Sequence, residues 1–144
     1  KKKIVVVVGS FDILDDVHKA LLREAFDLGE VSIGLTSDIM AGRMKKREVR
    51  DFKHRKKALE DFSGKELKAK PKIVKIENKF GPTLKEDFDY IIVSPETYPG
   101  AVLINRKRRK IRKKPIKIVK VEFVLDKKGE PISATKILKK TDKY

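Results

Sequence analysis

Residues 9–18, which read GSFDILDDVH, carry the side chains best suited to chemistry in this chain. Gly9 and Ser10 follow a run of five apolar residues, and His18 begins an amphipathic stretch. A strand that ends in glycine lets the backbone approach a ligand closely, and the N-terminus of a following helix binds anions through unpaired N–H groups. Ser10 would then contact a phosphate oxygen, and His18 would donate to charge developing at phosphorus. This spacing suits phosphoryl or nucleotidyl transfer.

A second set of polar residues lies near the carboxyl end of the chain. The sequence predicts a helix over residues 133–140, with Ser133 as its N-cap and Thr135 in its first turn. Hydroxyls and free N–H groups converge at such a helix end and form another anion site, although a plain N-cap explains Ser133 equally well. Glu96 follows a predicted buried strand. Open parallel sheets bind ligands at the carboxyl ends of their strands, which favours a site role for Glu96.

The rest of the chain alternates predicted strands with predicted helices. The β-branched run 4–8 is typical of a central strand, and apolar residues recur at helical spacing over 17–28. Alternation of this kind predicts an α/β fold, a Rossmann-like open parallel sheet with helices on both faces. We expect a single domain over residues 1–144, with 1–3 and 141–144 frayed. The other predicted strands are 31–36, 72–77, 90–94 and 117–124, and the other predicted helices are 38–44, 52–62, 83–87 and 99–112.

The first motif resembles the nucleotidyltransferase signature Gly-Thr-Phe-Asp-x-x-His-x-Gly-His. Four of its residues match, with Ser10 in place of threonine, Asp15 in place of the first histidine and Val17 in place of the glycine. The matching residues are Gly9, Phe11, Asp12 and His18. Further along, residues 34–38, residues 94–98 with Asn105, and residues 131–137 resemble later motifs of the same enzymes. Together they are similar to the archaeal-type phosphopantetheine adenylyltransferases over nearly the whole chain.

The resemblance implies an activity and a set of site residues. The activity is transfer of AMP from ATP to 4′-phosphopantetheine, giving dephospho-coenzyme A and pyrophosphate in coenzyme A biosynthesis. Mg²⁺ would accompany the ATP, and the resemblance implies no metal ligands on the protein. His18 and Ser10 would be catalytic. For Asp12 a structural role is favoured, in which it orients the turn or caps backbone N–H groups. The implied nucleotide-binding residues are Gly9, Phe11, Asp15, Glu96, Asn105, Ser133 and Thr135.

The departures from the signature keep other functions open. A carboxylate at Asp15 would repel phosphates unless it is protonated or bridged by a metal ion, and Val17 adds a β-branched side chain at a turn where the signature has glycine. With Ala134 in place of a serine, these changes favour a nucleotide-binding homologue with impaired catalysis as one alternative. Another is a related nucleotidyltransferase with a different acceptor, such as an FAD synthetase or a nicotinamide-nucleotide adenylyltransferase.

The charge balance suggests a further alternative. The chain has 37 Lys and Arg against 21 Asp and Glu, a net charge of +16, which favours nonspecific binding to nucleic acid. The densest basic run, residues 106–114, contains no aromatic residue for base stacking, so a solvated face that attracts triphosphates is the simpler interpretation. Within it, Arg108 and Arg109 would either bind a phosphate or face water. His54 is interpreted as a solvated residue rather than a metal ligand.

Composition also bears on the cellular setting. The chain has no cysteine and no apolar run near the roughly 20 residues of a membrane helix, so we expect a cytoplasmic protein. Its many charged residues and few side-chain amides are typical of heat-adapted proteins. The oligomeric state stays open.

Overall fold

The computed structural model of the protein describes residues 2–45 and 48–139. One sheet contains six strands: β1 (Ile4–Gly9), β2 (Glu30–Thr36), β3 (Lys72–Ile76), β4 (Tyr90–Val93), β5 (Lys117–Leu125) and β6 (Pro131–Lys139). The helices are α1 (Asp16–Leu28), α2 (Asp38–Lys45), α3 (Phe52–Glu66), α4 (Tyr98–Lys110) and the short 3-10 helix η1 (Gly81–Leu84). None of these helices is long and apolar enough to cross a membrane.

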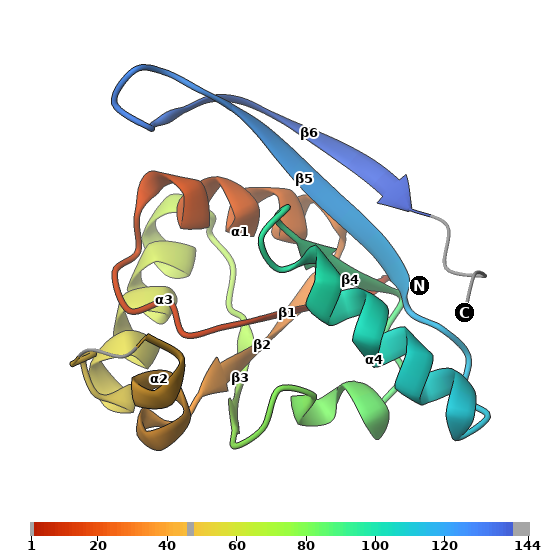
Figure 1. Ribbon diagram of the computed structural model, residues 1–144. Helices are drawn as coiled ribbons and strands as arrows, with labels where there is room; N and C mark the ends of the chain where they lie inside the picture. The colour runs from red at the N-terminus through yellow and green to blue at the C-terminus, as the bar shows by residue number, and fades with distance from the viewer. Residues whose placement is uncertain (1, 46–47, 140–144) are drawn as a thin grey trace.

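The strand order places β1 in the middle of the sheet. The order is β3-β2-β1-β4-β5-β6, and every neighbouring pair is parallel except β5 and β6 (Figure 1). The chain adds β2 and β3 on one side of β1 and then returns to add β4 and β5 on the other side. The predicted Rossmann-like α/β fold is therefore confirmed, with one antiparallel strand at its edge.

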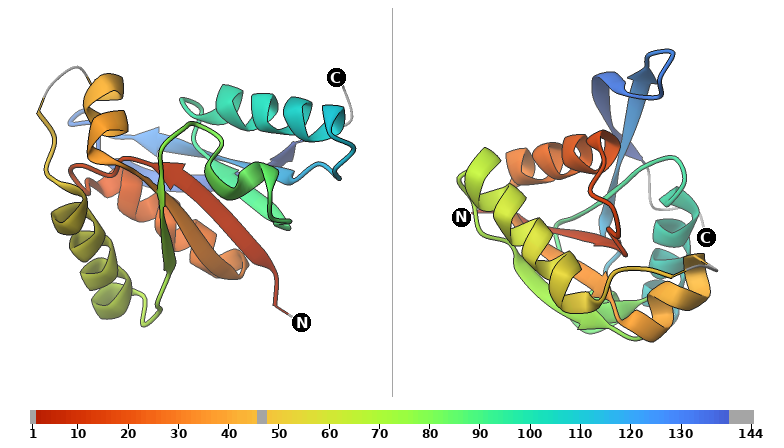
Figure 2. Two further views of the ribbon diagram at one scale, coloured as in Figure 1. Left: turned by 90° about the horizontal axis from the view of Figure 1, so that it is seen from below. Right: turned by 90° about the vertical axis from the view of Figure 1, so that its left-hand side faces the viewer.

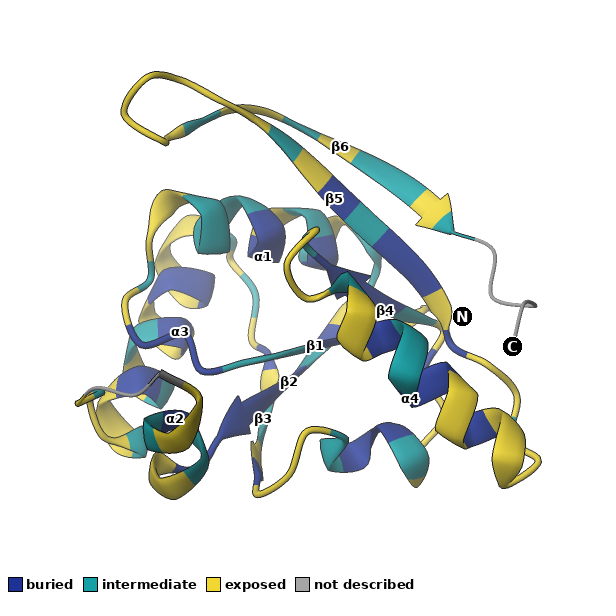
Figure 3. Cartoon of the chain, in the orientation of Figure 1, coloured by how far each residue is buried: buried dark blue, intermediate teal, exposed yellow. Residues whose placement is uncertain are grey.

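The central strands are buried on both faces because helices cover both sides of the sheet (Figures 2 and 3). Val5 and Val7 face α1 and α3, in a core that includes Leu22 and Leu59. Val6 faces the other way, in a second core together with residues of β4, α4 and β5. Burial on both faces explains why β1 is a continuous apolar run rather than an alternating one.

Two predicted boundaries need correction. Helix α3 continues to Glu66, past the end predicted at Phe62, because Ser63 is buried in the helix and Gly64 is tolerated there at a cost of about 1 kcal/mol. At the N-terminus, the carbonyl of Lys3 accepts a hydrogen bond from the Glu30 N–H at 2.9 Å, so Lys3 is not frayed as predicted. The fraying predicted for Lys1 and for residues 141–144 lies outside the described residues.

The prediction of a final helix over residues 133–140 was wrong. Within the described residues, this segment forms β6, which pairs antiparallel with β5 so that Thr135 lies opposite Glu122 and Ser133 opposite Val124. A turn at residues 126–129 connects the two strands, with Gly129 at φ 83°. Ser133 therefore caps no helix, and no helix dipole acts at this position.

Strand β6 is held against α1 by an ion-pair cluster. The Lys136 Nζ lies 2.8 Å from Asp27 Oδ2 and 3.3 Å from Glu24 Oε1. The hydrogen bond from Lys136 lowers the pKa of the Asp27 carboxyl, and the same bond raises the pKa of Lys136. The outer end of the β5–β6 hairpin extends beyond the helices (Figure 2), so this cluster is a main polar contact between the hairpin and the body.

We predict that Lys136→Met destabilises the protein slightly at neutral pH and hardly at all in acid. Because the folded-state pKa of Asp27 is depressed, its contribution is full above the ordinary value of 3.8 and is lost as the pH falls through the lowered pKa. Thermal unfolding at about pH 7 and about pH 2 measures the difference from wild type. Lys139→Met on the same strand is the control. A difference of equal size at both pH values would contradict the prediction.

Candidate active site

A crevice opens at the carboxyl edge of the sheet, between β1 and β4. The connections after these two strands leave in opposite directions, which is the point where open α/β sheets bind ligands. A cavity of about 250 Å³ lies there, bordered by Gly9, Thr36, Glu96 and Thr97. Its walls are mostly apolar and include Met40, Met44, Phe80, Val93 and Ile104. The crevice is therefore the candidate site.

A larger hollow of about 860 Å³ lies at the opposite edge. It is lined by residues at the amino ends of strands, among them Ile4, Glu30 and Lys72. Parallel sheets with this topology bind ligands at their carboxyl edge. We therefore build the site on the smaller cavity.

The turn after β1 favours a small residue at one position and accepts strain at another. A Cβ on Gly9 would lie 3.0 Å from the Phe11 ring, closer than side chains normally pack. Phe11 itself has φ 46°, an uncommon value for a residue with a side chain. The left-handed residue in this turn is thus Phe11, whereas Val17 lies in the first turn of α1.

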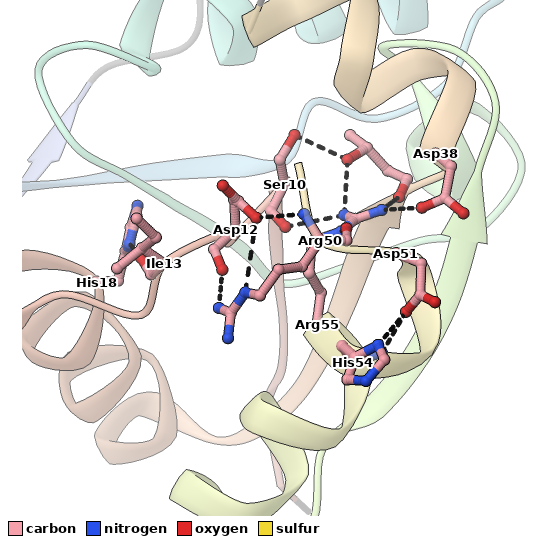
Figure 4. Close-up of polar contacts among 10 residues, drawn as sticks. Ser10, Asp12, Ile13, His18, Asp38, Arg50, Asp51, His54 and Arg55 are labelled. Carbon is pink, nitrogen blue, oxygen red and sulfur yellow. Dashed lines mark hydrogen bonds and ion pairs between the residues drawn. The ribbon is translucent and has the colours of Figure 1, made fainter. Parts of the chain in front are cut away.

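His18 lies at the start of α1 with one ring nitrogen already engaged. Its Nδ1 is 2.9 Å from the carbonyl oxygen of Ile13 (Figure 4). The same Nδ1 lies 3.2 Å from Asp15 Oδ1. A carbonyl oxygen only accepts, so Nδ1 carries a proton. The Phe11 ring packs edge-on against the imidazole at 5.3 Å between centroids. These contacts orient the ring and leave Nε2 as the nitrogen to contact a ligand.

Asp15 is the N-cap of α1. Its carboxylate accepts the His18 N–H at 2.8 Å and occupies one of the donors that an incoming anion would use. The side chain is 57% exposed. A negative charge at this helix end stabilises α1 but competes with a phosphate for the same dipole.

Ser10 faces the inside of the protein. The residue is buried, and its hydroxyl accepts a hydrogen bond of 2.8 Å from the Thr36 hydroxyl at the end of β2. Its carbonyl accepts from Arg55 at 2.9 Å. Ser10 therefore links two strand ends, and its contact with a phosphate stays a prediction.

Asp12 caps a backbone N–H group, as the sequence predicted. Its carboxylate accepts the Arg50 N–H at 2.8 Å and lies 3.7 Å from the Arg50 guanidinium, which also donates to the Asp12 carbonyl (Figure 4). The turn after β1 is thereby connected to the segment before α3. Sequence reasoning missed Arg50 and Arg55, because each reads as one more cation in a basic stretch.

Asn105, predicted to bind a nucleotide, is engaged inside the protein, and its contact with a nucleotide stays a prediction. It is fully buried, its Nδ2 donates to the Ile116 carbonyl, and its Oδ1 accepts the Ile116 N–H, both at 2.8 Å. The carboxamide thus joins α4 to the beginning of β5. The two hydrogen bonds to Ile116 explain why an asparagine at position 105 is useful to the fold.

Ser133 and Thr135 lie at the same edge of the sheet as the crevice. Val93, the last residue of β4, pairs with Lys120, and the Glu122–Thr135 pair lies two residues further along β5. Both hydroxyl residues are exposed. The tertiary structure thus brings the two predicted anion-binding segments to one edge, but the second supplies a strand instead of a helix N-terminus.

The basic run at residues 106–114 is not part of the crevice. Helix α4 starts at the crevice and runs toward the opposite edge of the sheet. Its last turn contains Lys107, Arg109 and Lys110. Cations there are favoured by the helix dipole. Arg108 fits neither predicted alternative, because it is buried and bonded to Asp87 at 2.7 Å.

His54 is exposed, consistent with the predicted solvated role. Its Nδ1 lies 2.6 Å from Asp51 Oδ1, and its backbone N–H donates to the same carboxylate. The bond from the His54 N–H lowers the pKa of Asp51. Asp51 and His54 therefore repeat at α3 the arrangement of Asp15 and His18 at α1.

Comparison with known proteins agrees with this architecture. The sequence model described as cytidylyltransferase-like matches residues 6–140. The chain belongs to the cytidylyltransferase-like family. It is 45% identical to the phosphopantetheine adenylyltransferase of Methanosarcina acetivorans, covering 94% of this chain and 88% of the relative. It is 41% identical to that of Archaeoglobus fulgidus, covering 97% and 96%. The resemblance found in the sequence is confirmed.

Solved structures share the fold. A protein of unknown function from Archaeoglobus fulgidus aligns with a TM-score of 0.78 and 43% identity, covering 81% of this chain and 87% of that chain. A lipopolysaccharide core biosynthesis protein from Thermoplasma volcanium aligns at 0.68 with 23% identity, covering 83% and 96%, which shows the fold alone.

We predict that Asn105→Ala destabilises this member of the family without affecting nucleotide binding. Removing the carboxamide leaves the buried N–H and carbonyl of Ile116 without partners, at a cost of about 2–4 kcal/mol. Denaturant unfolding measures the loss, and titration calorimetry with ATP measures affinity. A selective loss of ATP affinity with stability unchanged would restore the nucleotide-binding role.

We predict that Asp15→Asn tightens ATP binding about three- to tenfold, because asparagine keeps the N-cap bond and removes the negative charge. Asp51→Asn is a matched control, since Asp51 caps α3 through the same contact to a histidine N–H. Calorimetric titration of both variants with ATP checks this. Equal affinities in the two variants would show that the Asp15 charge does not act on the nucleotide.

Proposed function

We propose that the protein is an adenylyltransferase that transfers AMP from ATP to 4′-phosphopantetheine, releasing pyrophosphate and giving dephospho-coenzyme A. The observation that carries this proposal is near-full-length identity of 41–45% to proteins named phosphopantetheine adenylyltransferase. The crevice at the carboxyl edge supplies a site where such a reaction could take place. The cytoplasmic location expected from the sequence belongs to the same proposal.

The proposed reaction needs no covalent intermediate with the protein. An oxygen of the acceptor phosphate attacks the α-phosphorus of ATP, the bond to the bridging oxygen breaks, and pyrophosphate leaves with that electron pair. Positioning and electrostatic stabilisation supply the rate enhancement. With both ring nitrogens protonated, His18 would donate from Nε2 to the charge on the α-phosphate. Ser133 and Thr135 would bind the β- and γ-phosphates with their exposed hydroxyls.

ATP would enter this reaction with a divalent metal ion, for which we propose Mg²⁺. Among residues 2–45 and 48–139, no three His, Cys, Asp or Glu side chains gather to hold a metal. Mg²⁺ is commonly bound through substrate phosphates with few protein ligands. The triphosphate itself would therefore carry the ion.

The acceptor assignment is supported by the walls of the cavity. They are mostly apolar and come from α2, the segment before η1, β4 and α4, together with Glu96 and Thr97. A cavity of about 250 Å³ suits a flexible, largely uncharged arm. A charged nicotinamide nucleotide or a broad flavin ring suits it less well.

A second candidate function is nucleotide binding without turnover. One observation favours it: the Asp15 carboxylate occupies a donor at the N-terminus of α1, where the signature of these enzymes has histidine. Binding of ATP without release of pyrophosphate would distinguish this candidate.

The direct test is pyrophosphate release from ATP with a panel of acceptors. We expect release with 4′-phosphopantetheine and none with flavin mononucleotide or nicotinamide mononucleotide. No release with any acceptor would reject the proposed enzyme. If the protein releases no pyrophosphate but binds duplex DNA with an affinity that falls steeply with salt, and ATP does not compete with the DNA, its function is nonspecific nucleic-acid binding.

We further predict that His18→Ala lowers kcat on the order of a hundredfold or more, because loss of one preorganised donor raises the barrier by about 3–4 kcal/mol. His54→Ala is the control, since His54 has the same position relative to its own N-cap aspartate. Steady-state kinetics with ATP and 4′-phosphopantetheine decide the matter. Unchanged turnover in His18→Ala would refute the assignment.

A further inference from the structure

We infer that Arg55 is a positioning residue for the transfer reaction, fixing the turn after β1 from beneath. This inference rests on the proposed function for its kinetic consequences. Arg55 comes from the first turn of α3, and its side chain reaches under the carboxyl edge of the sheet (Figure 4). It is 0% exposed.

All five N–H donors of this guanidinium have an acceptor in the protein. Nε donates to the Arg50 carbonyl at 2.7 Å. Nη1 donates to the Ser10 carbonyl at 2.9 Å and to the Thr36 hydroxyl at 3.2 Å. Nη2 donates to the Thr36 carbonyl and to Asp38 Oδ1, both at 2.9 Å. The side chain is therefore held in one orientation.

These acceptors come from the ends of β1 and β2, which pair in the sheet, and from two segments that lie outside the sheet. The Ser10 carbonyl follows the last residue of β1, and Thr36 is the last residue of β2. Asp38 begins α2, and Arg50 precedes α3. The Thr36 hydroxyl in turn donates to Ser10 Oγ at 2.8 Å. The position of the Ser10 backbone, next to the proposed phosphate site, thus depends on Arg55.

Burying this charge is costly. Its only carboxylate partner in these bonds, Asp38, is 55% exposed, so much of the desolvation cost of the guanidinium is left uncompensated by an ion pair. Lysine could not replace it, because an ammonium has three donors and cannot bridge five acceptors in fixed geometry. The five bonds therefore hold several backbone segments in register next to the proposed site.

The chain contains a matched comparison in Arg108. This arginine is 1% exposed, donates to the carbonyls of Thr83, Glu86 and Lys114, and pairs with the exposed Asp87 at 2.7 Å. Its chemistry and burial resemble those of Arg55, but it joins α4 to η1 at the opposite edge of the sheet. A comparison of the two arginines therefore distinguishes a general effect on stability from a specific effect on the site.

The experiment compares Arg55→Lys with Arg108→Lys at a temperature where both variants are folded. We expect both to lower Tm. We expect only Arg55→Lys to lower kcat, by about tenfold or more, with the KM for ATP within about threefold, because a misplaced turn loses alignment at the reacting phosphorus. Arg108→Lys keeps kcat within about threefold of wild type. A loss of kcat in both variants, or no loss in either, would overturn the inference.

Hydrogen–deuterium exchange of the full chain supplies a readout that needs no turnover. We expect Arg55→Lys to speed amide exchange across residues 10–14, and Arg108→Lys to leave that segment unchanged. If wild type releases no pyrophosphate, the proposed function fails, and exchange alone decides whether Arg55 positions the turn. Unchanged amide exchange across residues 10–14 in Arg55→Lys would contradict the inference, whether or not the wild-type protein releases pyrophosphate.

A milder pair of variants covers the possibility that Arg55→Lys does not fold. Thr36→Val removes the hydroxyl shared by Arg55 and Ser10, and Thr83→Val removes an equally buried hydroxyl near Arg108. The same difference in amide exchange across residues 10–14 is expected between these two. Identical behaviour of the pair would contradict the role given to Arg55.

Discussion

The structure depends on the parallel pairing of β1 with β2 on one side and with β4 on the other. Because the chain leaves β1 and β4 in opposite directions, the loops that follow them separate and leave a crevice at the carboxyl edge. The turn at Gly9 and the loop before α4 both border that crevice for this one reason. Burial of β1 on both faces requires an apolar strand, so only its end is free to carry polar chemistry.

Two opposite charges act on the turn after β1. Asp15 is exposed and neutralises the positive end of α1 by accepting the His18 N–H, whereas Arg55 is buried and holds the Ser10 carbonyl from below. A surface carboxylate at a helix N-terminus is inexpensive in water, but it opposes an incoming phosphate. A buried guanidinium is costly to desolvate, but it imposes geometry. The turn therefore combines a helix N-terminus capped by a carboxylate with a backbone carbonyl bonded to a buried guanidinium.

Much of the fold could be predicted from local pattern, and the site only in part. The Val-rich run of β1 and the helical spacing of α1 are local signals, and both elements lie within a residue of prediction. The prediction of a helix over residues 133–140 failed because Ser133 resembles an N-cap. The segment forms strand β6 because it pairs with β5, and this pairing is not visible in the local sequence pattern. Asn105 is explained only by Ile116, and Arg55 only by Ser10 and Thr36. Such contacts join residues far apart in sequence, and no local spacing reveals them.

By itself, the sequence determined the α/β class, the strand–turn–helix at Gly9 and the family to which the chain belongs. These follow from hydrophobic periodicity and short motifs, which act over a few neighbouring residues. The tertiary structure alone decided that the carboxyl-terminal hydroxyls lie on a strand, that the basic run points away from the crevice, and that a buried arginine supports the turn. The physical reason is that strand pairing and burial depend on which distant segments meet, a property of the whole chain and not of any stretch of it.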